Sequence, residues 1–159
     1  MSKAHAAYGF TPNEETITGK YVGTFEGINV FESKKMGDIR NNYSGITIPE
    51  RGIIVGRGVF TSASNNGRAI LQHEYGHILQ YMEVGTKAYY RVIAPESLAS
   101  ATYSRIDKSY SHDLFWTETW ANYLSKNHFG IYWLGNPIDY PVKDISIYNK
   151  LRITMAKFF

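Results

Sequence analysis

The sequence contains no cysteine, which excludes two kinds of small protein at once. A disulfide-stapled scaffold is excluded, and so is a zinc site with thiolate ligands. Long apolar runs are also missing. No stretch approaches the roughly eighteen apolar residues of a transmembrane helix, so no membrane span is expected. The net charge of +3 is mild and comes without a run of Lys or Arg, so the sequence gives no indication of a nucleic-acid partner.

The N-terminal residues 1–15 lack the apolar stretch of a secretory signal peptide. The sequence therefore predicts a soluble protein, which stays in the cytoplasm as encoded or leaves by a non-classical or secretion-system route. A chain of this size can also be one domain of a longer protein.

The length and the apolar content fit one folded domain. The chain has 159 residues, of which 43% are hydrophobic and 15% are aromatic. That is enough apolar surface for one core and too much for a disordered chain. We therefore expect residues 1–159 to form a single domain. The 13 tyrosines have amphipathic rings that suit a peptide-binding groove as well as a core.

Strand patterns occupy the first part of the chain. Residues 21–33 predict a hairpin that turns at Glu26 and Gly27. Residues 45–60 predict a second strand pair, which turns at residues 49–52. Two such pairs indicate a small, mainly antiparallel sheet near the N-terminus.

Helical patterns occupy the second part. A helix is predicted from about Gly67 to Val84, stopped by Gly85, and it is apolar on most sides, which indicates a buried, central helix. Ser62, Ser64 and Asn66 are candidates for its N-cap. A second long helix is predicted over 113–128, before Gly130. The other expectations are a loose lead-in up to about Thr18, helix over 87–94, a short helix over 96–102 with Pro95 in its first turn, a loop over 103–111, a short strand over 131–134, and a helix or strand from Asp144 onward. The expected fold class is α+β, with the sheet packed on a helical half.

The motif H-E-x-x-H, a signature of zinc metallopeptidases, occurs at residues 73–77 (HEYGH). His73 and His77 lie one helical turn apart on one face, so one metal ion can bind a nitrogen of each. Glu74 lies about 100° round the helix from His73, which lets it reach a water on the metal. Gly76 costs a helix about 1 kcal/mol relative to Ala, which suggests close packing here. The alternative is a buried helix with two neutral histidines.

A catalytic zinc site needs a third protein ligand and an open fourth position. The glutamates that follow His77 are Glu83, Glu96 and Glu118. Glu83 points to another side of the same helix, and Glu96 lies in a first helical turn, where a carboxylate favours the helix dipole. Glu118 lies mid-helix between two tryptophans, where an unpaired carboxylate is costly and a metal ion would supply a counter-charge. We expect Glu118 to be the third ligand, and the alternative is a structural glutamate.

Polar residues around Glu118 are candidates for supporting roles. Asn122 lies one turn later on the same face, and its carbonyl suits the free N–H of a ligating histidine, unless it is a plain surface residue. His112 and His128 flank this helix and compete as ligands, although neither has a partner at ligand spacing. The candidates to stabilise an oxyanion from a nearby loop are His112, Tyr103, Tyr110 and Arg105, and each is otherwise an ordinary loop residue.

The arrangement His73-Glu74-x-x-His77 followed by Glu118-x-x-x-Asn122 resembles the gluzincins, which are zincin peptidases with two histidines and a glutamate on zinc. Their pattern ends in Asp where this sequence has Asn122. The resemblance implies a zincin-like fold and Zn²⁺ on both histidines and Glu118. It also implies hydrolysis in which Glu74 is the general base.

The same resemblance implies how a substrate binds. In the gluzincin plan a sheet precedes the active-site helix, and its edge strand pairs with an extended peptide. Here that edge strand would be residues 53–60. Main-chain pairing gives affinity with little sequence preference, so the implied partner is a peptide or protein substrate.

A narrower resemblance covers HEYGHILQ (73–80), YYRVIAPESLASA (89–101) and FWTETWAN (115–122). Together these stretches resemble small metallopeptidase-like domains at the C-terminal ends of bacterial Rhs-type polymorphic toxins. That implies a proteolytic effector delivered into competitors, with an immunity protein as its inhibitor.

Three readings of the sequence stay open. The first is an active zinc peptidase, and the second is a zincin fold that binds zinc or a peptide without cleaving, as an adaptor. The third is a metal-free α+β domain, against which Glu118 argues. The presence of Glu74 argues against the second, because an adaptor does not need it. The ligand set favours zinc, with manganese, iron and cobalt as alternatives.

Overall fold

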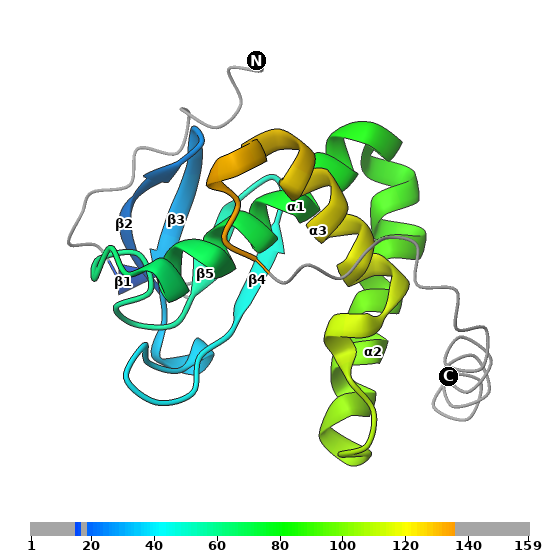
Figure 1. Ribbon diagram of the computed structural model, residues 1–159, viewed down its shortest axis with the longest axis horizontal. Coiled ribbons are helices and arrows are strands. Elements are labelled where there is room, and N and C mark those ends of the chain that lie inside the picture. Colours follow the sequence, from blue (N-terminus) through cyan, green and yellow to red (C-terminus); the bar gives the residue numbers. More distant parts are fainter. Residues whose placement is uncertain (1–14, 17–18, 136–159) are drawn as a thin grey trace.

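The computed structural model describes residues 15–16 and 19–135, and these residues form an α+β fold. The sheet lies on one side of the molecule, and a group of helices lies on the other (Figure 1). A short strand begins at Glu15, inside the predicted lead-in, whose other residues lie mostly outside the described ranges. The element predicted from Asp144 onward also lies outside them.

The sheet is mixed and has one parallel pair. Its strands are β1 (Glu15–Thr16), β2 (Gly19–Phe25), β3 (Ile28–Glu32), β4 (Gly45–Ile48) and β5 (Gly52–Val55), in the spatial order β1-β2-β3-β5-β4. Only β3 and β5 run parallel to each other. β2 and β3 form the predicted hairpin, turned by Glu26 and Gly27 with φ of 51° and 77°. Two left-handed residues make the tight turn whose twist matches that of the strands.

The family resemblance implies that residues 53–60 form an edge strand, and this assignment is wrong. β5 lies between β3 and β4, ends at Val55, and leaves β4 at the edge of the described sheet. The three side chains Ile53, Ile54 and Val55 are all buried. A continuous apolar run of this kind suits a strand covered on both faces, which is a central strand rather than an edge.

Helices make up the second part of the described chain. They are α1 (Asn65–Ala88), a π-helical turn (Tyr89–Ile93), α2 (Ala94–Ile106) and α3 (Trp116–Phe129), with 3-10 turns at Lys34–Met36, His112–Leu114 and Gly130–Tyr132. Ser64 caps α1, because its Oγ accepts a hydrogen bond from the Gly67 N–H at 3.1 Å. Gly85, the predicted stop, has a φ of 79° and kinks α1 there. Pro95 lies in the first turn of α2, as predicted.

Several boundaries differ from the prediction. α2 continues to Ile106 instead of ending at Thr102, so the predicted loop starts later. α3 begins at Trp116 instead of Asp113, after a 3-10 turn. Periodicity determines the middle of a helix better than its ends, where caps and tertiary contacts decide.

The strand predicted over residues 131–134 is also wrong, because the segment begins as a 3-10 turn. Gln72 of α1 binds this segment on both sides. Its Nε2 donates to the Tyr132 carbonyl oxygen at 2.9 Å, and its Oε1 accepts from the Leu134 N–H at 2.7 Å. Backbone groups that are paired with a side chain are not available to a strand partner.

The main core lies between the sheet and α1. Its buried apolar side chains are Ile28, Val30, Ile53, Val55, Val59, Leu71, Tyr75 and Ile78. Burial of these side chains fixes one face of α1 against the sheet. No helix in the described ranges combines the length and the apolar character that a membrane span needs.

The opposite side of α1 packs against α3 at Gly76. A Cβ added to this glycine would lie 2.2 Å from the backbone oxygen of Ala121. The two helix backbones therefore approach as closely as only glycine allows, which is the packing that its position inside the motif suggested. The close approach brings the histidines of α1 next to Glu118 of α3.

Candidate metal centre

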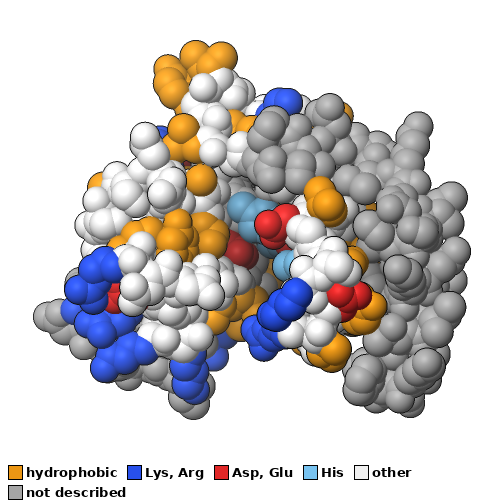
Figure 2. Space-filling model, turned by 60° about the horizontal axis from the view of Figure 1, so that its bottom comes forward, with side chains coloured by type: hydrophobic (Ala, Val, Ile, Leu, Met, Phe, Trp, Pro, Cys, Tyr) orange, Lys and Arg blue, Asp and Glu red, His pale blue; other side chains and the backbone are white. Residues whose placement is uncertain are grey.

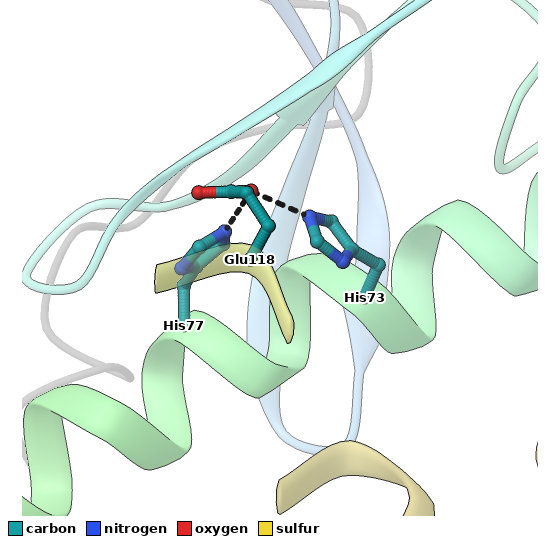
Figure 3. Close-up of side chains that lie close together, drawn as sticks. All are labelled: His73, His77 and Glu118. Atoms are coloured by element: carbon teal, nitrogen blue, oxygen red, sulfur yellow. Dashed lines mark hydrogen bonds and ion pairs between the residues drawn. The ribbon is translucent and has the colours of Figure 1, made fainter. Parts of the chain in front are cut away.

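Histidine and acidic side chains gather in a hollow of the surface (Figure 2). Three of the candidate ligands meet in one cluster: α1 contributes His73 and His77, and α3 contributes Glu118 (Figure 3). One ligand atom from each residue lies within 4.8 Å of the other two. Glu118 is 3% exposed, whereas the His73 side chain is 24% exposed, so the cluster is buried on one side and accessible on the other.

The distances within this cluster fit a metal ion. Glu118 Oε2 lies 3.2 Å from His73 Nε2 and 3.3 Å from His77 Nε2. Ligand atoms that are about 2.0–2.2 Å from a tetrahedral zinc ion lie roughly 3.3–3.6 Å from one another. Hydrogen bonds between a charged donor and a carboxylate are usually shorter, at about 2.7–2.9 Å. The spacing is therefore closer to that of zinc ligands than to that of a direct ion pair.

The far side of the His77 ring is held by Gln80. Gln80 Nε2 donates to the Thr117 carbonyl oxygen at 2.6 Å, and Gln80 Oε1 lies 2.7 Å from His77 Nδ1. Because the Thr117 oxygen can only accept, the amide orientation is fixed, and Gln80 Oε1 must accept from His77 Nδ1–H. A neutral His77 therefore presents the lone pair of Nε2 to the cluster.

The His73 ring is held in the same way by Asn122. Asn122 Oδ1 accepts a hydrogen bond from His73 Nδ1–H at 2.8 Å, so the Nε2 of a neutral His73 also presents a lone pair. Two imidazole lone pairs and the carboxylate oxygen of Glu118 then face one another. Three acceptors without a hydrogen between them repel each other, and a cation resolves the conflict.

Protons can take the place of that cation when no metal is bound. Burial opposes the charging of His73, but the neighbouring Glu118 carboxylate outweighs it and raises the pKa of His73 to about 10. The pKa of His77 is also raised, because the effect of the Glu118 carboxylate again outweighs that of burial. Burial works against the ionised form of Glu118, yet His77 and His73 hold the pKa of that carboxyl well below its usual range. Binding of a metal would therefore release protons from this cluster.

Glu74 is directed toward the edge strand beside this cluster. Thr47 Oγ1 of β4 lies 2.7 Å from Glu74 Oε2 and 2.9 Å from the Glu74 carbonyl oxygen. A Cβ added to Gly45 would lie 2.4 Å from Glu74 Oε1, so β4 passes directly over the carboxylate. Glu74 is 4% exposed, and its Oε1 accepts no hydrogen bond from the described residues.

His112 lies beside the three-residue cluster without belonging to it. Its Nε2 is 3.5 Å from Glu118 Oε2, and its Nδ1 is 2.9 Å from Ser100 Oγ. Ser100 Oγ is in turn 2.6 Å from the Tyr110 hydroxyl, so Tyr110 supports His112 instead of facing the cluster. Burial lowers the pKa of His112, which keeps its ring neutral.

The other candidates from the sequence lie elsewhere. The Tyr103 hydroxyl donates to Asp107 Oδ2 at 3.2 Å, and Arg105 is exposed on α2. His128 Nε2 is 3.3 Å from Glu26 Oε2, near the hairpin turn. Neither of the alternative glutamates belongs to the cluster: Glu83 is exposed, and Glu96 accepts a hydrogen bond from Trp116 Nε1 at 2.6 Å.

Five polar residues that the sequence reasoning missed hold the candidate site residues, namely Thr47, Gln80, Ser97, Ser100 and Thr117. Gln80 carried a usable signal, because it lies three residues after His77 and so shares its helix face. Thr117 precedes Glu118 directly. The other three come from β4 and α2, and no spacing in the sequence relates them to the motif.

Comparison with protein-family models, with curated proteins and with solved structures finds no significant match for this chain. The resemblances to gluzincins and to toxin domains therefore stay predictions. The geometry of the cluster and its surroundings is therefore the basis for a functional assignment.

Proposed function

We propose that this chain is a zinc-dependent metallopeptidase. His73 Nε2, His77 Nε2 and Glu118 Oε2 would hold the ion. When bound there, zinc would polarise a peptide carbonyl and lower the pKa of a water in the open fourth position. The observation that carries the proposal is the meeting of three acceptor atoms, two of them on imidazoles whose tautomers are fixed from behind.

The proposal makes Glu74 the general base that takes a proton from this water and later gives it to the leaving amine. Its surroundings support that role. The Thr47 hydroxyl restrains Oε2, and no described residue donates a hydrogen bond to Oε1. Glu74 is not needed to hold a metal, and this supports catalysis over a non-catalytic adaptor.

In the proposed mechanism, His112 stabilises the negative charge that develops on the carbonyl oxygen of the substrate. Burial raises the pKa of Tyr110, so its hydroxyl keeps its proton and can donate to Ser100 Oγ. If Ser100 donates in turn to His112 Nδ1, the ring hydrogen lies on Nε2, which is the nitrogen turned toward Glu118. In that tautomer His112 would offer a neutral N–H donor to the developing oxyanion.

Replacing His112 by Ala is expected to lower kcat about 10²–10³-fold, the usual loss for one oxyanion donor, and to leave the metal content unchanged. The matched control is His128→Ala, because His128 pairs with Glu26 and lies outside the cluster. Steady-state kinetics and metal analysis would be done on the same preparations. Loss of metal from the His112 variant would instead make this histidine a ligand.

The position of β4 supports an extended peptide as the substrate. β4 is the edge strand of the described sheet, and its Thr47 contacts the Glu74 carboxylate. A peptide strand added to β4 would therefore run alongside the general base, held by main-chain hydrogen bonds. We infer a peptide or unfolded protein substrate recognised with little dependence on side chains.

The experiment that tests the proposed function is the cleavage of a denatured protein by the purified chain. Cleavage is expected with zinc present, is expected to stop when a chelator removes the metal, and is expected to return when zinc is added back. A zinc-loaded chain that cleaves neither the denatured protein nor a library of unstructured peptides would contradict the proposal and favour a binding role.

A further inference from the structure

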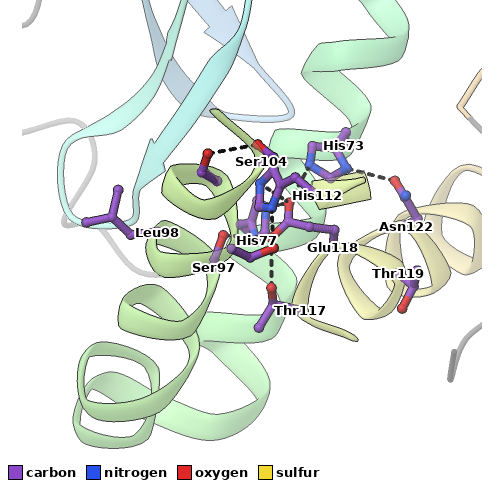
Figure 4. Close-up of polar contacts among 12 residues, drawn as sticks. His73, His77, Ser97, Leu98, Ser104, His112, Thr117, Glu118, Thr119 and Asn122 are labelled. Carbon is purple, nitrogen blue, oxygen red and sulfur yellow. Dashed lines mark hydrogen bonds and ion pairs between the residues drawn. The ribbon is translucent and has the colours of Figure 1, made fainter. Parts of the chain in front are cut away.

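The two oxygens of the Glu118 carboxylate have different surroundings. Oε2 is the oxygen that faces the three imidazoles, at 3.2 Å, 3.3 Å and 3.5 Å. Oε1 instead accepts hydrogen bonds from Ser97 Oγ at 2.6 Å and from Thr117 Oγ1 at 2.8 Å. Figure 4 shows Ser97 and Thr117 near Glu118, together with the histidines. Ser97 comes from α2, so a third helix takes part in the site.

The two hydroxyls donate one hydrogen bond to each of the two lone pairs of Glu118 Oε1. Hydrogen bonds from hydroxyls to a carboxylate are among the stronger ones in proteins, and both Thr117 and Glu118 are buried. If Oε1 turned toward an ion, both hydroxyls would lose their acceptor, and Thr117 would do so in a buried place. Glu118 can therefore offer Oε2 while its other oxygen stays where it is.

The number of donor atoms decides what kind of metal site results. Two imidazole nitrogens and one carboxylate oxygen give three donors, which leaves a position for water on a tetrahedral ion. A carboxylate that bound through both oxygens would add a fourth protein donor. That would close the site in the manner of structural zinc sites.

We propose that Ser97 and Thr117 are positioning residues that hold Glu118 as a one-oxygen ligand and so keep a coordination position open for water. This inference rests on the proposed function and deepens it. In this proposal the two hydroxyls contact Oε1 of Glu118 and act only through that carboxylate.

The test uses the full chain with the variants Ser97→Ala, Thr117→Val and both together. Valine keeps the shape of the buried Thr117 side chain, and the Thr117 carbonyl that binds Gln80 is unaffected. Zinc affinity is measured by competition with a coloured chelator, and the cobalt(II)-loaded proteins are compared by visible absorption. The matched control is Ser104→Ala, also on α2, whose hydroxyl donates to the Ala101 carbonyl at 2.8 Å.

The double variant is expected to bind zinc about 10–100-fold more weakly, as is usual when the groups that orient a ligand are removed. Its cobalt(II) absorption bands are expected to shift, because a second carboxylate oxygen in place of water changes the donor set of the ion. Thr117→Ser should keep the wild-type affinity and spectrum, since it keeps the hydroxyl.

Two results would overturn the inference, and they differ in what they say about the proposed function. A double variant with wild-type affinity and an unchanged cobalt spectrum would remove the positioning role and leave the metallopeptidase proposal standing. A wild-type chain that takes up neither zinc nor cobalt would overturn both. If Thr117→Val impairs folding, the single variant Ser97→Ala is used for the test, because Ser97 is partly exposed.

Discussion

Replacing Glu74 by Gln is expected to abolish most of the peptidase activity and to leave the metal in place. The amide has the size of the carboxylate, and its oxygen can still accept from the Thr47 hydroxyl, but it cannot take a proton. General-base catalysis contributes about 10²–10⁴-fold, so kcat should fall by that factor. Zinc content per chain should match the wild type, because the proposed ligands His73, His77 and Glu118 are untouched.

The measurement pairs initial rates on an unstructured peptide with metal analysis of the same samples. Glu83→Gln is the matched control, since Glu83 lies on the same helix, is exposed and is not part of the cluster of His73, His77 and Glu118. A Glu74→Gln chain that cleaves at the wild-type rate would remove the general-base role. A variant that loses its zinc would show that Glu74 holds the site together instead of acting on water.

Replacing Gly76 by Ala is expected to destabilise the fold, although the same change in most helices is stabilising by about 1 kcal/mol. The new Cβ would lie 2.2 Å from the Ala121 oxygen and 2.7 Å from its carbonyl carbon, so α1 and α3 must separate. Overpacking of this kind costs typically about 1–3 kcal/mol. Because the separation also moves Glu118 away from both histidines, zinc affinity should fall with stability.

Urea unfolding of the metal-free chains, followed by zinc titration, would measure both effects. Met82→Ala is a suitable control on the same helix, because Met82 is 69% exposed, and its free energy of unfolding should change little. A Gly76→Ala chain as stable as the wild type, with the same zinc affinity, would mean that the two helices are not held together at this point.

Local signals predicted much of the fold. The hairpin follows from Glu26 and Gly27 between β-prone runs. Ser64, one of three N-cap candidates, caps α1, and Gly85 marks the kink near its end. Ile53-Ile54-Val55 have the continuous apolar pattern of a central strand, whereas the resemblance to gluzincins implies an edge strand here, and the strand order agrees with the pattern. The segment after Gly130 is rich in β-prone residues, yet a buried Gln72 decides its conformation from a distance.

The candidate site also has a part that the sequence predicts and a part that it does not. His73, Glu74 and His77 follow from one helical turn, and Glu118 follows from the cost of a carboxylate among apolar residues. The hydroxyls that hold them, on Thr47 and Ser97 among others, come from elements far away in the sequence. Contacts of that kind depend on how the helices and the edge strand pack, and neither periodicity nor spacing carries this information.

The central claim is that His73, His77 and Glu118 hold one metal ion, and the most direct test is the metal content of the purified chain and of two variants. About one zinc per chain is expected in the wild type. It should be lost in both His73→Ala and Glu118→Ala. Zinc that stays bound in Glu118→Ala would contradict the assignment of the third ligand and point to His112. A wild-type chain that holds no metal, and takes up none from solution, would contradict the claim as a whole.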